Sequence, residues 1–137
     1  MKVEGGCHCG AIAFEAEVDP EAARICHCND CQITTGSAFR VNVLASATTF
    51  KLIRGAPKIY IETAHSGNRR ANAFCGDCGV PIYAAAAENT TSHPVRVGKL
   101  RQRAVIAKPI QQYFCSSALC WSMDLEDIAK ESAAEPS

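Results

Sequence analysis

The sequence predicts a mainly β fold for a single domain spanning residues 1–137. A length of 137 residues is typical of one domain, and no linker-like segment interrupts the chain. Short alternating or β-branched stretches recur along it, separated by turn signals rich in glycine, asparagine and proline. Most of the nine cysteines fall into three close groups, a pattern typical of metal ligation, which would cross-link a core of modest size.

The clearest predicted strand spans residues 11–18, where apolar and polar side chains alternate with the period of a half-buried strand. The residues expected on its buried face are Ile12, Phe14, Ala16 and Val18. Six further strands are predicted from β-branched and aromatic stretches at 39–44, 48–54, 58–63, 70–74, 81–86 and 95–98. Asp124 to Ala133 alone has a helical pattern, which predicts a short C-terminal helix and then a frayed tail from about residue 131.

The three cysteine groups have the spacings Cys7-x-Cys9, Cys26-x-Cys28-x-x-Cys31 and Cys75-x-x-Cys78. In an extended segment the first pair projects to one side, and the last pair forms a knuckle with glycine after each cysteine. Two pairs supply the four thiolates of a closed tetrahedral zinc site, whereas the group of three fills three positions. Spacing alone leaves open whether Cys75 and Cys78 combine with Cys7 and Cys9 or with two members of the triad.

A disulfide framework is disfavoured because the cysteine count is odd and no stretch resembles a signal peptide. We therefore expect reduced thiols in a cytoplasmic protein. Basic and acidic side chains balance at 14 each, which argues against nucleic acid as a partner, and no apolar run is long enough to cross a membrane.

The chain resembles the glutathione-dependent formaldehyde-activating family, which includes domains of the centromere protein V type. The resemblance rests on GGCHCGAI at 5–12, CHCNDC at 26–31 and TGSAF at 35–39. Further matches are SGN at 66–68, FCGDCG at 74–79, VGKL at 97–100 and the late Trp121. Together these motifs span roughly residues 3–125, which is nearly the whole chain.

This resemblance implies small antiparallel sheets that lean together like a tent around two zinc ions. It implies a structural zinc held by Cys7, Cys9, Cys75 and Cys78, and a reactive zinc held by Cys26, Cys28 and Cys31. The implied activity is that of a carbon–sulfur lyase, which joins glutathione to formaldehyde to give S-hydroxymethylglutathione. The expected partners are therefore a small thiol and a small aldehyde.

Three thiolates make zinc a weak Lewis acid, so a substrate thiol suits the fourth position better than an activated water. Addition to an aldehyde creates an alkoxide that needs a donor, and His27 and Ser37 are candidates beside the triad. The fourth protein ligand stays open, since His27, Asp30 or Cys115 could close the site. We expect Cys115 and Cys120 to be buried as small apolar residues.

Glutathione carries two carboxylates, for which basic side chains are available at Arg69, Arg70, Lys99, Arg101 and Arg103. The chain departs from the family pattern at Asn72, where an arginine is often found, and at Arg101, where an acid is often found. These departures leave the identity of the thiol and the aldehyde open. Two other functions fit the cysteine pattern, namely a non-catalytic zinc-stabilised binding module and a thiol redox sensor.

Overall fold

The computed structural model describes residues 1–133, which form ten strands, one α-helix and four short 3₁₀ turns. The strands are β1 (Lys2–Gly6), β2 (Ala13–Glu17), β3 (Arg24–Cys26), β4 (Arg40–Ser46), β5 (Lys51–Arg54), β6 (Lys58–Thr63), β7 (Arg69–Phe74), β8 (Pro81–Ala86), β9 (Ser92–Arg96) and β10 (Gln111–Tyr113). The helix α1 spans Asn29–Thr35. The 3₁₀ turns are Val97–Lys99, Arg103–Val105, Cys115–Ser117 and Cys120–Met123. The chain is therefore mainly β, as the sequence predicts.

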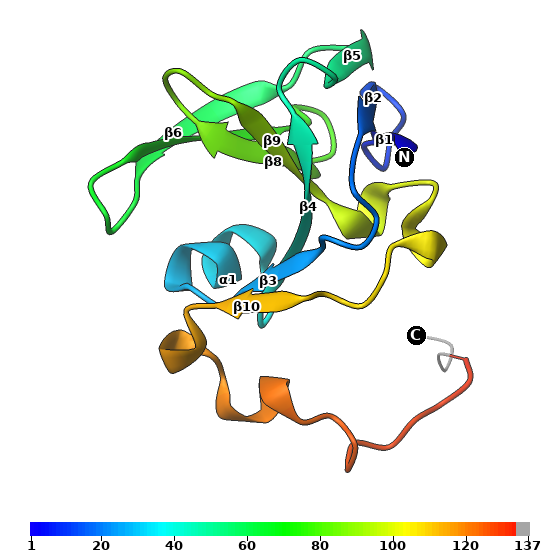
Figure 1. The fold of residues 1–137 in the computed structure, drawn as a ribbon, viewed down its shortest axis with the longest axis vertical. Coiled ribbons are helices and arrows are strands. Elements are labelled where there is room, and N and C mark those ends of the chain that lie inside the picture. Colours follow the sequence, from blue (N-terminus) through cyan, green and yellow to red (C-terminus); the bar gives the residue numbers. More distant parts are fainter. Residues whose placement is uncertain (134–137) are drawn as a thin grey trace.

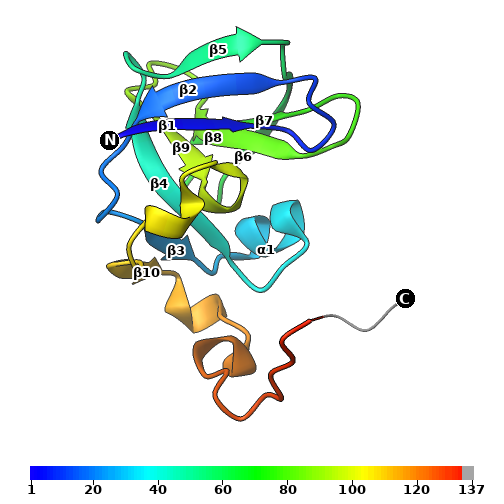
Figure 2. The same cartoon turned by 90° about the vertical axis from the view of Figure 1, so that its right-hand side faces the viewer.

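The strands form two sheets that lean against each other (Figures 1 and 2). A three-stranded sheet has the order β1-β2-β5, and a seven-stranded sheet has the order β10-β3-β4-β9-β8-β7-β6. All strand pairs are antiparallel except β10 and β3. Figure 2 shows the smaller sheet at one end of the molecule, with α1, β3 and β10 further down.

The core lies between the two sheets and is built mainly from small and β-branched side chains. Its members are Val3, Ile12, Phe14, Ala16, Val18, Val43, Ala45, Ala73, Cys75, Ile82, Val95 and Leu100. The predicted buried face of the strand at 11–18 is confirmed, because its four residues are at most 5% exposed. Aromatic contacts join the sheets: Phe50 stacks on Phe14 of β2 at 5.2 Å and on His93 of β9 at 4.7 Å.

Every predicted strand has a counterpart, and the predicted bounds of β6 and β8 match the observed ones. The stretch at 48–54 is shortened to β5, and the last predicted strand begins three residues and ends two residues earlier, at β9. The structure adds β1, β3 and β10, which the sequence analysis did not predict. Two of these, β3 and β10, are only three residues long, too short for a period to be recognised.

The predicted C-terminal helix is wrong for the described part of that segment, since residues 124–133 contain only turns and bends. Leu125 and Ile128 are about half exposed there, so no apolar face packs against the body to stabilise a short helix. Residues 134–137 of the predicted tail lie outside the described residues. None of the helices in residues 1–133 is long and apolar enough to span a membrane.

The helix α1 was not predicted, although it carries two of the cysteine positions at its start. Cys28 is its N-cap, and the Cys28 sulfur accepts a hydrogen bond from the backbone N–H of Cys31 at 3.4 Å. Gly36 ends the helix in the left-handed conformation with φ of 62°. Since the helix has only seven residues, capping and contacts with neighbouring residues determine its formation more than intrinsic propensity.

Candidate metal centres and the adjoining cavity

The first candidate centre joins the two sheets. Cys7 and Cys9 lie on the turn between β1 and β2, and Cys75 and Cys78 lie on the turn between β7 and β8. All four sulfur atoms lie within 4.8 Å of one another. The Cys7–Cys9 and Cys9–Cys75 sulfur distances are 3.5 and 3.8 Å. Sulfurs on a tetrahedral zinc lie about 3.8 Å apart, so this four-cysteine cluster fits a closed zinc site.

Backbone N–H groups prepare this cluster to carry negative charge. The amide of Ile12 donates to the Cys7 sulfur at 3.2 Å. The backbone amides of Cys9 and Val80 lower the pKa of the Cys78 thiol to about 6. Such donors stabilise thiolates, the form that binds a metal ion. The knuckle itself closes through the N–H of Gly79, which adopts φ of 74° and donates to the carbonyl oxygen of Cys75 at 2.9 Å.

The second candidate centre is local in sequence. Cys26 ends β3, Cys28 caps α1, and Cys31 lies in the first turn of the helix. Their three sulfur atoms also lie within 4.8 Å of one another. Within residues 1–133 no histidine, cysteine or acidic side chain joins this triad as a fourth ligand at that spacing. The triad can therefore hold a metal ion with three protein ligands, the count typical of catalytic zinc.

The thiols of the triad influence one another's pKa, and a nearby arginine contacts one of them. A hydrogen bond from the Cys31 thiol lowers the pKa of Cys26 to about 5, and the same interaction raises the pKa of Cys31. Three thiolates at this spacing repel one another unless a cation lies among them. One cation is supplied by the protein, because Nη2 of Arg40 donates to the Cys31 sulfur. A metal dication would supply the rest, which is the chemical reason the triad fits one.

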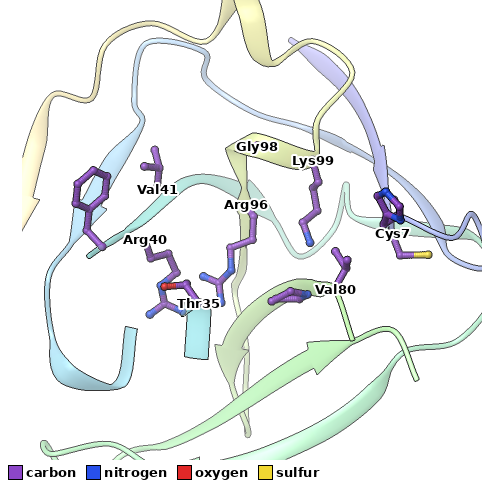
Figure 3. Close-up of a pocket in the computed structure, with 12 residues that line it drawn as sticks. Cys7, Thr35, Arg40, Val41, Val80, Arg96, Gly98 and Lys99 are labelled. Carbon is purple, nitrogen blue, oxygen red and sulfur yellow. The ribbon is translucent and has the colours of Figure 1, made fainter. Parts of the chain in front are cut away.

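A cavity of about 540 Å³ lies between the two centres (Figure 3). Its walls come from the β1–β2 turn, the end of α1, the start of β4, the start of β8 and the turn after β9. The lining residues are Gly6, Cys7, His8, Thr35, Phe39, Arg40, Val41, Val80, Pro81, Arg96, Gly98 and Lys99. We refer to it as the cation-lined cavity, because Arg40, Arg96 and Lys99 all line it.

The triad meets this cavity through Arg40. The cavity lining includes Cys7 of the four-cysteine cluster but none of the triad cysteines themselves. Arg40 touches both, since its guanidinium contacts Cys31 and also lines the cavity. Thr35 lies at the same end in Figure 3, and its hydroxyl donates to the Cys31 carbonyl oxygen at 2.6 Å. A ligand in the cavity could therefore contact Arg40, which in turn contacts the triad.

The two predicted donors do not line this cavity. His27 is fully buried, its Nε2 lies 2.7 Å from Oε1 of Gln112, and its ring packs edge-on against Phe39. His27 is therefore held in the protein interior by its contacts with Gln112 and Phe39. Ser37 is exposed and lines a different pocket, next to Trp121.

The other residues considered in the sequence analysis, Asp30, Cys115 and Cys120, do not join either cysteine cluster. Asp30 is exposed. The expected burial of Cys115 and Cys120 is wrong, since both thiols are exposed on the segment after β10. That segment extends away from the sheets (orange and red in Figure 1), so its apolar residues have little to pack against.

Of the five basic residues considered for carboxylates, Lys99 alone lines the cation-lined cavity. Arg69 and Arg101 form ion pairs on the surface, with Glu88 and Glu4. Arg70 and Arg103 donate to backbone carbonyl oxygens of Ala84 and Leu100.

The sequence analysis missed Arg40 and Arg96. The antiparallel pairing of β4 with β9, in which Asn42 lies opposite Arg96, brings the two arginines together. No local signal in the sequence indicates this pairing, because the residues are more than fifty positions apart.

Two comparisons with known proteins bear on these centres. The sequence model of the family described as "Glutathione-dependent formaldehyde-activating enzyme" matches residues 2–117 of this chain. A crystal structure of a Rhodobacter sphaeroides protein is similar in fold, with a TM-score of 0.61 and 22% sequence identity. That likeness covers 80% of this chain and 98% of the other. At this level of identity the second comparison supports the fold alone.

Proposed function

Because this chain belongs to the glutathione-dependent formaldehyde-activating enzyme family, we propose that it joins a small thiol to a small aldehyde. Glutathione and formaldehyde are the first substrates to test, and the product is then S-hydroxymethylglutathione. The enzyme would be a carbon–sulfur lyase that works in the reducing cytoplasm. One observation carries the proposal: a cluster of three sulfurs lies beside a cation-lined cavity, whereas the other cluster has four.

The two clusters would hold one zinc ion each, in different roles. Cys7, Cys9, Cys75 and Cys78 would hold a structural ion, because four protein thiolates complete its coordination. Cys26, Cys28 and Cys31 would hold the reactive ion. When bound there, zinc supplies a cationic centre that favours the thiolate form of a substrate thiol.

The cationic residues of the cavity would stabilise the negative charge that develops on the carbonyl oxygen during the reaction. The thiol sulfur forms a bond to the carbonyl carbon, the carbonyl π electrons move to oxygen, and the thiol proton ends on the new hydroxyl group. Arg40, Arg96 and Lys99 can stabilise the developing alkoxide, because each is a cationic donor at the cavity wall. They are better placed for this than His27 and Ser37, which lie outside the cavity lining.

The proposal is tested by counting sulfur atoms around zinc before and after glutathione is added. Metal analysis should give two zinc ions per chain. Zinc-edge X-ray absorption should then show the mean number of sulfur neighbours rising from about 3.5 to about 4, because only the triad has room for another thiolate.

Two controls show whether any change in the spectrum comes from a thiol that binds at the triad. S-methylglutathione, which has no thiol, should leave the spectrum unchanged, and Cys120→Ser should behave like the wild type because this thiol lies outside both clusters. If both zinc ions already have four protein ligands in the absence of thiol, the enzyme proposal fails. A non-catalytic zinc-stabilised binding module would then explain the two clusters better.

A further inference from the structure

The seven-stranded sheet ends at β6 with an open edge. β6 is the last strand in the order of that sheet, and Figure 1 shows it at the outer margin of the molecule. Within residues 1–133 no backbone hydrogen bond joins β6 to any segment other than β7. Three consecutive apolar side chains of β6, Ile59, Tyr60 and Ile61, are 40–57% exposed. An edge of this kind can pair with a further strand.

The other sheet edges of the described chain are less suited to pairing. The segment after β9 covers β1, because the N–H of Arg101 donates to the carbonyl oxygen of Glu4 at 2.8 Å. β5 carries Lys51 and Arg54 but no acid, so two paired copies of it would gather cations without a counter-charge. β10 is only three residues long. The edge at β6 is therefore the one that needs an explanation.

The sequence of β6 is complementary to itself in charge and in apolar pattern. Residues 58–62 read KIYIE, so a base and an acid lie symmetrically about Tyr60. In an antiparallel pair with the two Tyr60 residues opposite each other, Lys58 lies opposite Glu62 of the second copy. The same register places Ile59 opposite Ile61 of the second copy. A register centred on Ile59 or Ile61 instead places both charges opposite uncharged side chains.

The two charges of β6 have no ion-pair partner within residues 1–133. Arg70 of β7 lies opposite Glu62, but its guanidinium donates to the carbonyl oxygen of Ala84 at 3.1 Å. Lys58 lies opposite an aromatic residue, Phe74. Both charges are therefore available to a partner strand.

The apolar side chains of β6 also lack cover. Ile59 and Ile61 lie opposite Ala73 and Ala71 of β7, whose methyl groups are too small to shield them from water. Four isoleucines, two from each copy, would meet on one face of a paired sheet and cover one another.

We propose that β6 pairs with β6 of a second copy of this chain, antiparallel about a two-fold axis beside Tyr60, so that the two seven-stranded sheets become continuous. Such an interface is isologous, because both copies contribute the same surface. A single strand pair is smaller than a standard interface, so the dimer should dissociate at micromolar concentrations. The proposal does not depend on the proposed function, since no residue of β6 lines the cation-lined cavity.

A charge swap tests the register. Sedimentation velocity of the zinc-loaded full chain at several concentrations measures the monomer–dimer equilibrium. Lys58→Glu and Glu62→Lys should each weaken the dimer about tenfold, because each turns two attractive pairs into two repulsive ones. The double variant K58E/E62K restores opposite charges and should return to within about threefold of the wild type. Losses that simply add in the double variant would overturn the proposal.

A structural role for Lys58 predicts a different pattern. Its side chain lies over Gly76 of the knuckle, where an added Cβ would be 2.9 Å from Cε of Lys58. Zinc content and melting temperature are therefore measured for every variant. If Lys58→Glu loses zinc while Glu62→Lys keeps the wild-type dimer, Lys58 serves the four-cysteine cluster and the proposal fails.

The apolar part of the interface has a matched control on the other sheet. Ile59→Arg should weaken the dimer at least about tenfold, because pairing would bury an uncompensated charge. Ile53→Arg should stay within about twofold of the wild type, since Ile53 lies on β5 and is similarly exposed, 59% against 48% for Ile59. Equal losses in the two variants would indicate a general effect of added charge and overturn the proposal.

Amide hydrogen exchange locates the contact. The outward N–H groups of β6 should exchange more slowly in a concentrated sample than in a dilute one, whereas exchange in β5 should not change. A dimer without this protection would be joined through another surface, and the proposal would fail. A wild type that stays monomeric at every concentration would also overturn it, and would leave the edge for a strand of another protein.

Discussion

Arg40 is the residue that connects the triad to the cavity. Its Nη2 donates to the Cys31 sulfur, and its guanidinium lines the space where a co-substrate would lie. Three cysteine thiolates around a dication leave a net charge near minus one, and a bound substrate thiolate makes it near minus two. A cation in direct contact with one sulfur lowers the energy of that charged state. Arg40 would therefore favour both retention of a metal ion at the triad and entry of the proposed substrate thiolate.

We predict that Arg40→Met weakens zinc binding at the triad and lowers glutathione affinity about tenfold or more, because a charge-assisted hydrogen bond is lost. Chelator competition measures the first effect and a glutathione titration the second. Arg40→Lys should recover part of each, since it keeps the charge but loses the planar fork. Arg69→Met is the control, because Arg69 pairs with Glu88 on the surface. Unchanged zinc retention in Arg40→Met would contradict this role.

At the scale of single residues, the sequence predicts ligands better than it predicts their surroundings. Cysteine spacing was enough to identify all seven sulfurs that cluster. Which sulfurs meet required the resemblance, because the four-cysteine cluster joins turns that are 66 residues apart between Cys9 and Cys75. The positions of Arg40 and Arg96 required the register of β4 against β9, and such long-range pairing leaves no trace in local patterns.

The helix α1 is the element that holds the triad in shape, and its two ends do so in different ways. The N-terminal end is capped by the Cys28 sulfur, so a candidate metal ligand is also part of the helix start. At the C-terminal end the N–H of Gly36 caps the last turn. Thr35, which lines the cavity, is the residue just before it. Gly36 therefore fixes where α1 ends, next to a residue that lines the cavity.

We predict that Gly36→Ala destabilises the protein by about 1 kcal/mol, because a side chain in the left-handed region is strained. The strain is isolated from packing, since a Cβ at Gly36 would meet no atom within 4 Å. Gly98→Ala is a matched control: it also has open space, and its φ is not in the left-handed range. Urea denaturation of the two zinc-loaded variants measures the difference. Equal midpoints would show that this cap does not stabilise the helix.

The elements that the sequence predicts well are those with a regular period and a buried face. The strand at 11–18 is the clearest case, since its alternating pattern matches the burial of Phe14 and Ala16. The helical pattern at 124–133 led to a wrong prediction, because a short amphipathic helix is stable only where its apolar side packs against another surface. Leu125 and Ile128 find no such surface. The sequence gives no periodic signal for the short helix α1. Its seven residues include a cysteine and β-branched residues and lack apolar residues at helical spacing.

At the scale of the whole molecule, we expect the two clusters to contribute differently to stability. The four-cysteine cluster ties the turn of the three-stranded sheet to the turn of the seven-stranded sheet. A metal ion there would close a long loop between the sheets, which the core of small side chains would otherwise hold alone. The triad instead joins residues within a stretch of six positions, from Cys26 to Cys31. Loss of a metal ion from the triad would therefore remove much less long-range order.

We therefore predict that Cys75→Ser gives mostly insoluble protein, whereas Cys28→Ser stays soluble with about one zinc ion per chain and no lyase activity. The serine at position 28 keeps a hydroxyl that can cap α1, so the helix start survives the loss of the ligand. Soluble yield, zinc content and melting temperature measure the contrast, with Cys120→Ser as the neutral control. Equal loss of solubility in Cys28→Ser and Cys75→Ser would mean that both metal sites hold the fold together. The triad would then be scaffolding, and the difference between its three ligands and the four of its neighbour would carry no function.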